Sequence, residues 1–429
     1  MPATRRSLLG GIAASSYLSI QGANDAVRIG LIGCGGRGLY VSGFMAKVPG
    51  VAIAAVCDVH TALAEKAKAR AGSGCSAYQD FRKLLEQRDL DAVVVATPDH
   101  WHAIATIRAL EAGKAVYVEK PLAHNVREGR AMLEAARRTR KLALPGTQHR
   151  SAAHYAEAAR RIAAGEIGEV RLVRVWNFSN MLPNGIGRAP DSAPPPELDW
   201  DLYLGPAPMR PYNPRRHGPT YRWFTDYAGG TITDFGVHRF DTVHQIMGEK
   251  SPLSVSAAGG RFALNDMGEM PDTMTVTYQY PGYAMVYEMS NINGFGSGGR
   301  QPGVRYYNAR TTQDRPHGEA YYGTKGTILA DRIGYEVYME GESKPPLRVD
   351  AADATSLHAA HFIACIRGLE QPRSDLERAH RATNVAHLGN IAYLTGRRIQ
   401  WNEKEESIPG DREADALLGR TPRKPWTLA

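Results

Sequence analysis

Residues 27–38 read VRIGLIGCGGRG. A β-branched run leads into the spacing Gly33-x-Gly35-x-x-Gly38, which is typical of the strand, tight turn and helix that bind a dinucleotide. Gly33 permits the turn, Gly35 lets the backbone approach a pyrophosphate, and Gly38 lets the helix pack closely on the strand. The free N–H groups at the start of that helix favour an anion, so the stretch predicts a pyrophosphate site.

An acidic residue follows at the spacing that a ribose contact requires. The apolar run VAIAAVCD predicts a second strand that ends at Asp58, 20 residues after Gly38. A carboxylate there accepts hydrogen bonds from the adenosine ribose and repels a 2′-phosphate, so we expect NAD rather than NADP. A purely structural glycine turn is the alternative, but strand, turn, helix, strand and acidic end in register favour dinucleotide binding.

Bulk properties exclude several classes of protein. A chain of 429 residues is long enough for two domains with a large core. Its formal net charge is +8, but the basic residues are scattered, so we expect no nucleic-acid partner. The four cysteines show neither metal-ligand spacing nor a disulfide framework, so we expect no bound metal from them.

The first 26 residues form a separate segment. Arg5 and Arg6 precede an apolar stretch, residues 8–20, that is too short and too rich in Gly and Ser to span a membrane. This pattern is similar to a twin-arginine export signal, with a disordered leader as the alternative. We therefore expect a periplasmic or otherwise exported protein with no integral membrane span, loaded with cofactor before translocation.

The alternation of strand and helix signals predicts a Rossmann domain over residues 27–150. The expected strands cover residues 27–33, 51–58, 91–98, 115–121 and 142–148, and the expected helices cover residues 61–71, 81–87, 102–112 and 126–138. The predicted fold class is α/β, with this NAD-binding domain followed by a second α/β domain.

The second domain is expected over residues 151–429. A strand at 170–178 precedes an irregular, aromatic-rich stretch at 183–230, and alternating runs at 273–280 and 283–290 predict antiparallel strands with one covered face. Further helices are expected at residues 155–164, 356–367 and 376–394, and the closing segment 401–426 is expected to wrap the surface.

Two further motifs carry chemistry. Glu119-Lys120-Pro121 ends a predicted strand, at the sheet edge where ligands collect in open α/β folds. Asp234 and His238 are spaced i, i+4, so a helix beginning near Asp234 places both on one face, where a carboxylate and an imidazole support proton transfer. The alternatives are an ordinary surface lysine, a helix N-cap followed by core histidines, and a metal site completed by His244.

Together these residues resemble the glucose–fructose oxidoreductase/inositol dehydrogenase (Gfo/Idh/MocA) family. The resemblance rests on the glycine turn, Thr97-Pro98, Glu119-Lys120-Pro121 and the Asp234-x-x-x-His238 pair after Gly229-Gly230. It implies Lys120 and His238 beside the reacting hydroxyl carbon, Asp234 orienting substrate, and a second domain with a large open, mainly antiparallel sheet that often mediates oligomer contacts. The stretch DWDLYLGPAPMRPYNP and the closing KPW resemble an exported bacterial subgroup.

The resemblance implies an NAD-dependent oxidoreductase acting on a sugar, polyol or sugar derivative, with the protein a dimer or tetramer. Export to a compartment with little free NAD leads us to expect a tightly held cofactor. An NAD-dependent glycoside hydrolase and a non-catalytic sugar-binding relative are the alternatives. The expected catalytic residues are Lys120, His238 and Asp234. The expected cofactor-binding residues are Gly33, Gly35, Gly36, Arg37, Gly38, Asp58, Thr97, Pro98, His102, Glu119, Lys120 and Gln148, and the expected substrate-binding residues are Arg150, Tyr221, Arg222 and Trp223.

Overall fold

A computed structural model describes residues 26–296, 315–343 and 346–428. The expected export signal lies outside these residues. Within the described ranges, no helix is both long enough and apolar enough to cross a membrane. All four cysteines fall in this part of the chain and are free thiols.

The first domain is built on a six-stranded parallel sheet in the order β3-β2-β1-β4-β5-β6. This is the strand order of a Rossmann fold, and it reverses between β1 and β4, where such folds bind ligands. Its central strands are almost entirely apolar because helices cover both faces. The strands are β1 (Val27–Ile32), β2 (Val51–Cys57), β3 (Ser76–Tyr78), β4 (Ala92–Val95), β5 (Ala115–Val118) and β6 (Ala143–Pro145).

The helices of this domain lie close to their expected positions. They are α1 (Gly36–Met45), α2 (Thr61–Ala71), α3 (Phe81–Leu85), α4 (His102–Glu111) and α5 (Val126–Thr139). The expected strands extend beyond the observed ones, because residues such as Gly33 and Asp58 belong to the loops that leave the carboxyl edge. The short strand β3 was not expected at all.

The second domain carries a nine-stranded sheet in the order β14-β13-β12-β11-β7-β10-β9-β8-β15. Only β7 and β10 pair in parallel, so the sheet is mainly antiparallel and the expected fold class is confirmed. Its strands are β7 (Val170–Phe178), β8 (Ser254–Gly260), β9 (Thr273–Tyr280), β10 (Tyr283–Ser290), β11 (His317–Gly323), β12 (Gly326–Asp331), β13 (Gly334–Met339), β14 (Leu347–Asp350) and β15 (Ile399–Gln400).

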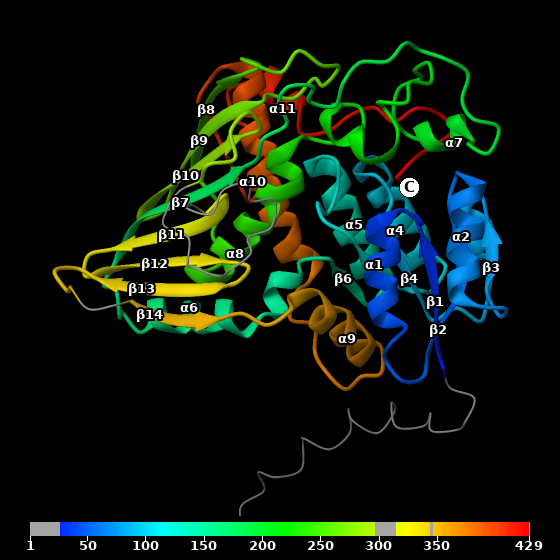
Figure 1. Ribbon diagram of the computed structural model, residues 1–429, viewed down its shortest axis with the longest axis horizontal. Helices are drawn as coiled ribbons and strands as arrows, with labels where there is room; N and C mark the ends of the chain where they lie inside the picture. The colour runs from blue at the N-terminus through cyan, green and yellow to red at the C-terminus, as the bar shows by residue number, and fades with distance from the viewer. Residues whose placement is uncertain (1–25, 297–314, 344–345, 429) are drawn as a thin grey trace, which may run out of the picture.

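Helices cover one face of this sheet. α8 (Val237–Met247) and α10 (Leu376–Thr395) lie between the sheet and the Rossmann domain, and α6 (Ala153–Ala163) packs beside β12 and β13 (Figure 1). In β9, buried residues alternate with exposed ones, which is the pattern of a strand with one solvated face. Among the described residues, the opposite face of the sheet is partly open to solvent, although residues 317–321 of β11 are buried on both sides.

Late parts of the chain return to the first domain. Helix α9 (Ala354–Ile366) packs against α1, and its Phe362 and Ile363 belong to the apolar cluster around β1 and β4. The last described residues lie beside the Rossmann domain, and Trp426 joins the cluster on the other face of its sheet (Figure 1). The closing segment wraps the surface as expected, and it ends against the nucleotide-binding half.

The irregular stretch 183–230 has a small core of its own. Two short helical turns, α7 (Trp200–Leu204) and η3 (Gly218–Trp223), interrupt it. Most of its aromatic side chains pack with one another; Trp200, for example, stacks on Tyr203 with ring centroids 4.9 Å apart. Packing within the loop therefore accounts for most of these aromatics, and few remain to face a ligand.

Candidate active site

A cavity of about 610 Å³ opens at the carboxyl ends of the parallel strands, where the strand order reverses. One wall comes from the Rossmann domain and the other from the aromatic stretch between residues 202 and 222. The described residues lining it are Ile32, Gly33, Gly35, Gly36, Arg37, Cys57, Asp58, Val59, Leu63, Gln79, Phe81, Ala96, Thr97, Pro98, Trp101, His102, Ala105, Glu119, Lys120, Leu202, Tyr203, His217, Gly218, Pro219, Tyr221 and Arg222.

The glycine turn has the geometry that a pyrophosphate site needs. Gly33 has φ +94°, and a Cβ there would lie 2.6 Å from the backbone of Ala96. A Cβ at Gly38 would lie 2.1 Å from the carbonyl oxygen of Gly33, so α1 packs directly on the turn. At Gly35 a Cβ would meet no described atom within 4 Å, and this open space belongs to the cavity. The turn therefore fits a ligand that approaches its backbone.

Asp58 fixes this turn from the end of β2. Its carboxylate accepts hydrogen bonds from the backbone N–H groups of Cys34, at 2.8 Å, and His60, at 2.9 Å. Burial raises the pKa of Asp58, although these two hydrogen bonds oppose the rise. Asp58 also lines the cavity, so its remaining lone pairs are placed to accept hydrogen bonds from a ribose.

Half-buried Arg37 forms an ion pair with buried Glu119, and both residues line the cavity. The Arg37 Nε lies 2.8 Å from Glu119 Oε1, and Tyr117 donates to the same oxygen at 3.4 Å. The Arg37 Nη2 is buried without a hydrogen-bond partner in the described part of the protein. An unpaired donor beside an open glycine turn fits an anionic ligand.

His102 joins the loop that carries Thr97 to the loop that carries Lys120 and Pro121. Its ring nitrogens lie 2.7 Å from the carbonyl oxygen of Pro121 and 3.0 Å from that of Thr97. The Lys120–Pro121 peptide bond is cis. The Thr97 hydroxyl is buried and has no hydrogen-bond partner among the described residues, so it is available to a polar group of a bound ligand.

Lys120, Asp234 and Arg222 meet at one end of the cavity. Lys120 Nζ donates to the Asp234 carboxylate at 2.6 Å and to the Asp234 carbonyl oxygen at 2.7 Å. Arg222 Nε lies 3.0 Å from the other carboxylate oxygen. Burial alone would raise the pKa of Asp234, but the two cations hold it well below its usual range. Asp234 is thus a permanent carboxylate between two cations.

Asp234 lies in a π-helical turn, Ile232–Gly236, that leads directly into α8. This turn differs from the regular helix expected to begin near Asp234, and such turns occur often at functional sites. Asp234 is therefore not a helix N-cap. Further along α8, the His244 Nε2 lies 3.2 Å from the Tyr280 hydroxyl, so His244 contacts the sheet rather than Asp234.

His238 follows one turn after Asp234. Burial and the nearby charge of Lys120 lower the pKa of His238 well below its ordinary value, so the imidazole is neutral. Its ring stacks on that of His149 with centroids 5.1 Å apart, and its Nδ1 is buried without a partner in the described ranges. A neutral, desolvated imidazole of this kind can accept a proton.

Six of the expected site residues lie outside the set of described residues that line the cavity. Asp234 contacts the lining residues Lys120 and Arg222, and His238 follows on α8. Arg150 is buried in an ion pair with Asp241, at 2.8 Å, and contacts Glu249 at 2.9 Å, so its expected role in substrate binding is corrected to a structural one. The other three are Gly38, beneath the turn, and Gln148 and Trp223, which are also outside the set of described lining residues.

The structure adds residues that the sequence reasoning missed. Asp99 is buried beside the cavity and accepts a hydrogen bond from the Tyr221 hydroxyl at 3.0 Å, while the Arg222 guanidinium lies 4.8 Å from the centre of the Tyr221 ring. Phe81, Trp101 and His217 also line the cavity. The position of Asp99 and Trp101 just after a predicted strand could have identified them.

A dinucleotide cleft that ends at Lys120, whose ammonium group is paired with Asp234 one helical turn before a neutral imidazole, has the arrangement of a nicotinamide-dependent oxidoreductase. The comparisons agree. The model described as "Oxidoreductase family, NAD-binding Rossmann fold" matches residues 27–147, and the model of the C-terminal α/β domain matches residues 175–291. The chain belongs to the Gfo/Idh/MocA oxidoreductase family.

Individual relatives cover the chain unequally. The scyllo-inositol 2-dehydrogenase (NAD(+)) of Bacillus subtilis is 25% identical over 81% of this chain and 88% of its own length. A glycosyl hydrolase family 109 protein of Shewanella sp. is 34% identical, but over 33% of this chain and only 30% of its own length. The structure of levoglucosan dehydrogenase with NADH and levoglucosan matches with a TM-score of 0.66, at 18% identity, over 87% of this chain and 99% of that one.

Proposed function

We propose that this protein is an NAD-dependent dehydrogenase that oxidises a hydroxyl group of a sugar, polyol or sugar derivative. One observation carries the proposal: Lys120, at the end of a dinucleotide cleft, lies 2.6 Å from the carboxylate of Asp234. Asp234 in turn precedes the neutral His238 by one helical turn. Polyol and anhydrosugar dehydrogenases among the relatives and structural neighbours support the substrate class.

Each group has a task in this reaction. NAD, held by the glycine turn, Asp58 and the Thr97 loop, supplies a hydride acceptor when bound. His238 accepts the proton of the reacting hydroxyl because burial keeps its imidazole neutral. Lys120 donates a hydrogen bond to the same oxygen as carbonyl character develops, and Asp234 fixes the direction of the ammonium group.

The test begins with the cofactor. Denatured protein is examined by mass spectrometry for released nucleotide, and a panel of sugars and polyols is then followed by NADH absorbance. Lys120→Ala and His238→Ala should each lower kcat by about 10² to 10⁴ and leave NAD binding intact. Lys47→Ala, an exposed lysine on the first domain, is the control. Full turnover in either active-site variant would overturn the proposal.

An NAD-dependent glycosidase is the second candidate, because a glycosyl hydrolase family 109 protein is 34% identical over 148 residues. In such a reaction, ring oxidation is followed by elimination, addition of water and re-reduction, so no net NADH forms. Incubation with an aryl glycoside separates the candidates. Release of the aglycone without net NADH supports the glycosidase, and accumulation of NADH without cleavage supports the dehydrogenase.

We further propose that the protein is exported by the twin-arginine route with NAD retained through each catalytic cycle. The Arg5-Arg6 pair before an apolar stretch supports the route. Retention suits a site where free NAD is scarce, and it requires a second, reducible sugar that takes the hydride back from NADH and so regenerates NAD in place. Arg5→Lys with Arg6→Lys should leave the protein in the cytoplasm, and unchanged export in this variant would refute the route.

The open face of the nine-stranded sheet is proposed as a contact between copies of this chain. Leu172, Tyr322 and Tyr338 are 40%, 37% and 40% exposed, and the strand register places them in one row with Thr327 between the two tyrosines. Multi-angle light scattering should give a dimer or tetramer, and Tyr322→Arg should shift it toward monomer. A monomeric wild-type protein would exclude this contact.

A further inference from the structure

Trp101 forms part of the wall at the apolar end of the nucleotide cavity, together with Phe81 and Leu63. This end lies past Asp58 and away from Lys120, where a Rossmann fold places adenine. Phe81 meets the Trp101 ring edge-on at a centroid distance of 5.5 Å. The indole N–H donates to the carbonyl oxygen of Tyr203 at 2.9 Å.

The segment 197–206 of the second domain is fixed directly over this wall. Its Gly205 has φ +49°, and a Cβ there would lie 2.1 Å from the Trp101 ring, so the backbone lies flat on the indole. At its other end, the N–H of Thr61 donates to the carbonyl oxygen of Glu197 at 2.9 Å, three residues after Asp58. The segment therefore bridges the two sides of the adenosine end.

The C-terminal segment of the chain contacts both Trp101 and the segment 197–206. We call residues 401–428 the C-terminal strap. Its Trp426 packs edge-on against Trp101 with centroids 4.6 Å apart, and Arg423 donates to the carbonyl oxygen of Gly205 at 2.9 Å and to Asp201 at 2.6 Å. Trp101 is thus enclosed by Trp426, Phe81 and Gly205 on the sides that do not face the cavity.

The strap is anchored along the Rossmann domain before it reaches Trp101. Arg420 donates to Glu128 on α5 at 2.7 Å, to the carbonyl oxygen of His100 at 3.0 Å and to that of Asp226 at 3.2 Å. One guanidinium therefore joins the strap to α5, to the loop that carries Trp101 and to the aromatic stretch.

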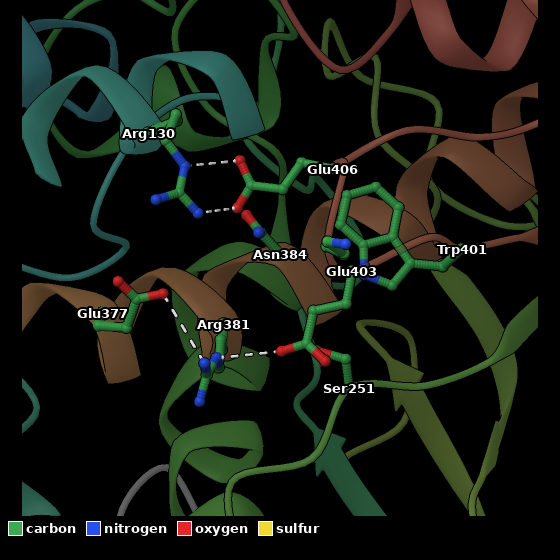
Figure 2. Close-up of a pocket in the computed structure, with 9 residues that line it drawn as sticks. Arg130, Ser251, Glu377, Arg381, Asn384, Trp401, Glu403 and Glu406 are labelled. Carbon is green, nitrogen blue, oxygen red and sulfur yellow. Dashed lines mark hydrogen bonds and ion pairs between the residues drawn. The ribbon is translucent and has the colours of Figure 1, made fainter. Parts of the chain in front are cut away.

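Figure 2 shows where the strap begins, at a polar pocket between α5 and α10. Glu406 receives two hydrogen bonds from Arg130, at 2.9 and 2.5 Å, and Arg381 lies 3.1 Å from Glu403. Apart from Lys404, the acidic and basic side chains that line this pocket pair with each other, since Arg381 also lies 3.8 Å from Glu377. The pocket therefore lies at the contact between the strap and helices α5 and α10, where ion pairs join them, and it is not a charged ligand site.

We infer that the C-terminal strap is a positioning element that holds Trp101 and the segment 197–206 around the adenosine half of NAD and slows its release. The inference rests on the proposed function, because it assumes that NAD occupies the cavity. The physical basis is packing: the strap holds in place the Trp101 ring and the segment 197–206 at the adenosine end of the cavity, and every contact described above opposes a movement of these walls away from the nucleotide. Affinity changes of this kind are expressed mainly in the dissociation rate.

The test compares Trp426→Ala with Val337→Ala in the full-length protein. Val337 is buried in β13 of the other domain, so its truncation controls for general destabilisation. Each protein is loaded with NAD, passed through gel filtration and sampled over time for bound nucleotide, at a fixed interval below its own melting temperature. Trp426→Ala should speed release by about tenfold or more, and Val337→Ala should leave it within about twofold.

Two further variants keep the inference falsifiable if Trp426→Ala folds poorly. Trp426→Phe should restore most of the retention, and Arg423→Gln should speed release while Trp426 stays in place. The equilibrium Kd for NAD should rise, and turnover of the NAD-loaded protein should stay near that of the wild type. Equal release from the wild type and the strap variants would overturn the inference, whereas a wild type that binds no NAD would overturn the proposed function instead.

Discussion

Replacement of Glu406 by glutamine should measure how much the contacts of Glu406 with Arg130 and His380, at the start of the strap, contribute to the free energy of unfolding. Burial alone would raise the pKa of Glu406, but hydrogen bonds from His380 and Arg130 lower it from 4.5 to about 2. At about 1.36 kcal/mol per pH unit, this difference corresponds to about 3 kcal/mol at pH 7. The carboxylate remains partly open to solvent, so we expect about 2 kcal/mol after screening.

The pH dependence has a fixed sign. Because the folded-state pKa is the lower one, this stabilisation is fully present above pH 4.5 and is lost as the pH falls toward about 2. Urea unfolding, followed by circular dichroism, should show Glu406→Gln about 2 kcal/mol less stable than the wild type at pH 7, and the difference should fall to less than half at pH 3.

Glu405→Gln is the matched control. Glu405 is exposed, and its carboxylate accepts from Asn402 at 3.1 Å without a cationic partner in the hydrogen bonds described for it. Its replacement should change the free energy of unfolding by less than about 0.5 kcal/mol. Equal losses for the two variants, or a loss at Glu406 that does not change with pH, would refute the electrostatic reasoning.

Three further outcomes are expected. The kcat/KM profile should lack the inflection near pH 6.5 of a free imidazole, because burial lowers the pKa of His238; a step at that pH would show that the ring is solvated. Gly38→Ala should cost about 3 kcal/mol or more in thermal unfolding, because its Cβ would lie 2.1 Å from the Gly33 carbonyl oxygen; wild-type stability would mean that α1 can shift away. Asp58→Ser should raise NADP affinity relative to NAD in calorimetric titrations and lower stability by about 1 to 3 kcal/mol, since the Cys34 N–H loses its acceptor; an unchanged ratio would remove Asp58 from cofactor selection.

Much of the fold could be predicted because the Rossmann half is built from local signals. Buried β-branched strands alternate with helices whose ends are marked by turn residues, so β1, α1, β2 and α2 fall where the sequence places them. Strand β3 could not be predicted from the sequence because it has only three residues, all of them half-buried. No periodic pattern is visible over so short a run.

The candidate site was predictable in part. Lys120 and Asp234 are 114 positions apart, yet the resemblance brings them together and the structure pairs them. Arg150 was misassigned because its true partner, Asp241, lies 91 positions away and nothing local marks the pair. The π-helical turn at Asp234 could not be predicted either, since nothing in the stretch TDFGVH distinguishes such a turn from a regular helix.

The return of α9 and the strap to the first domain sets an order of events during synthesis. When residues 27–150 have been synthesised, all six strands of the Rossmann sheet are present. Phe362 and Trp426, which complete the apolar clusters on its two faces, have not yet been synthesised. The nucleotide-binding half therefore reaches its final packing only after almost the whole chain has emerged. The N-terminal half expressed alone would therefore lack side chains that belong to both of its apolar clusters.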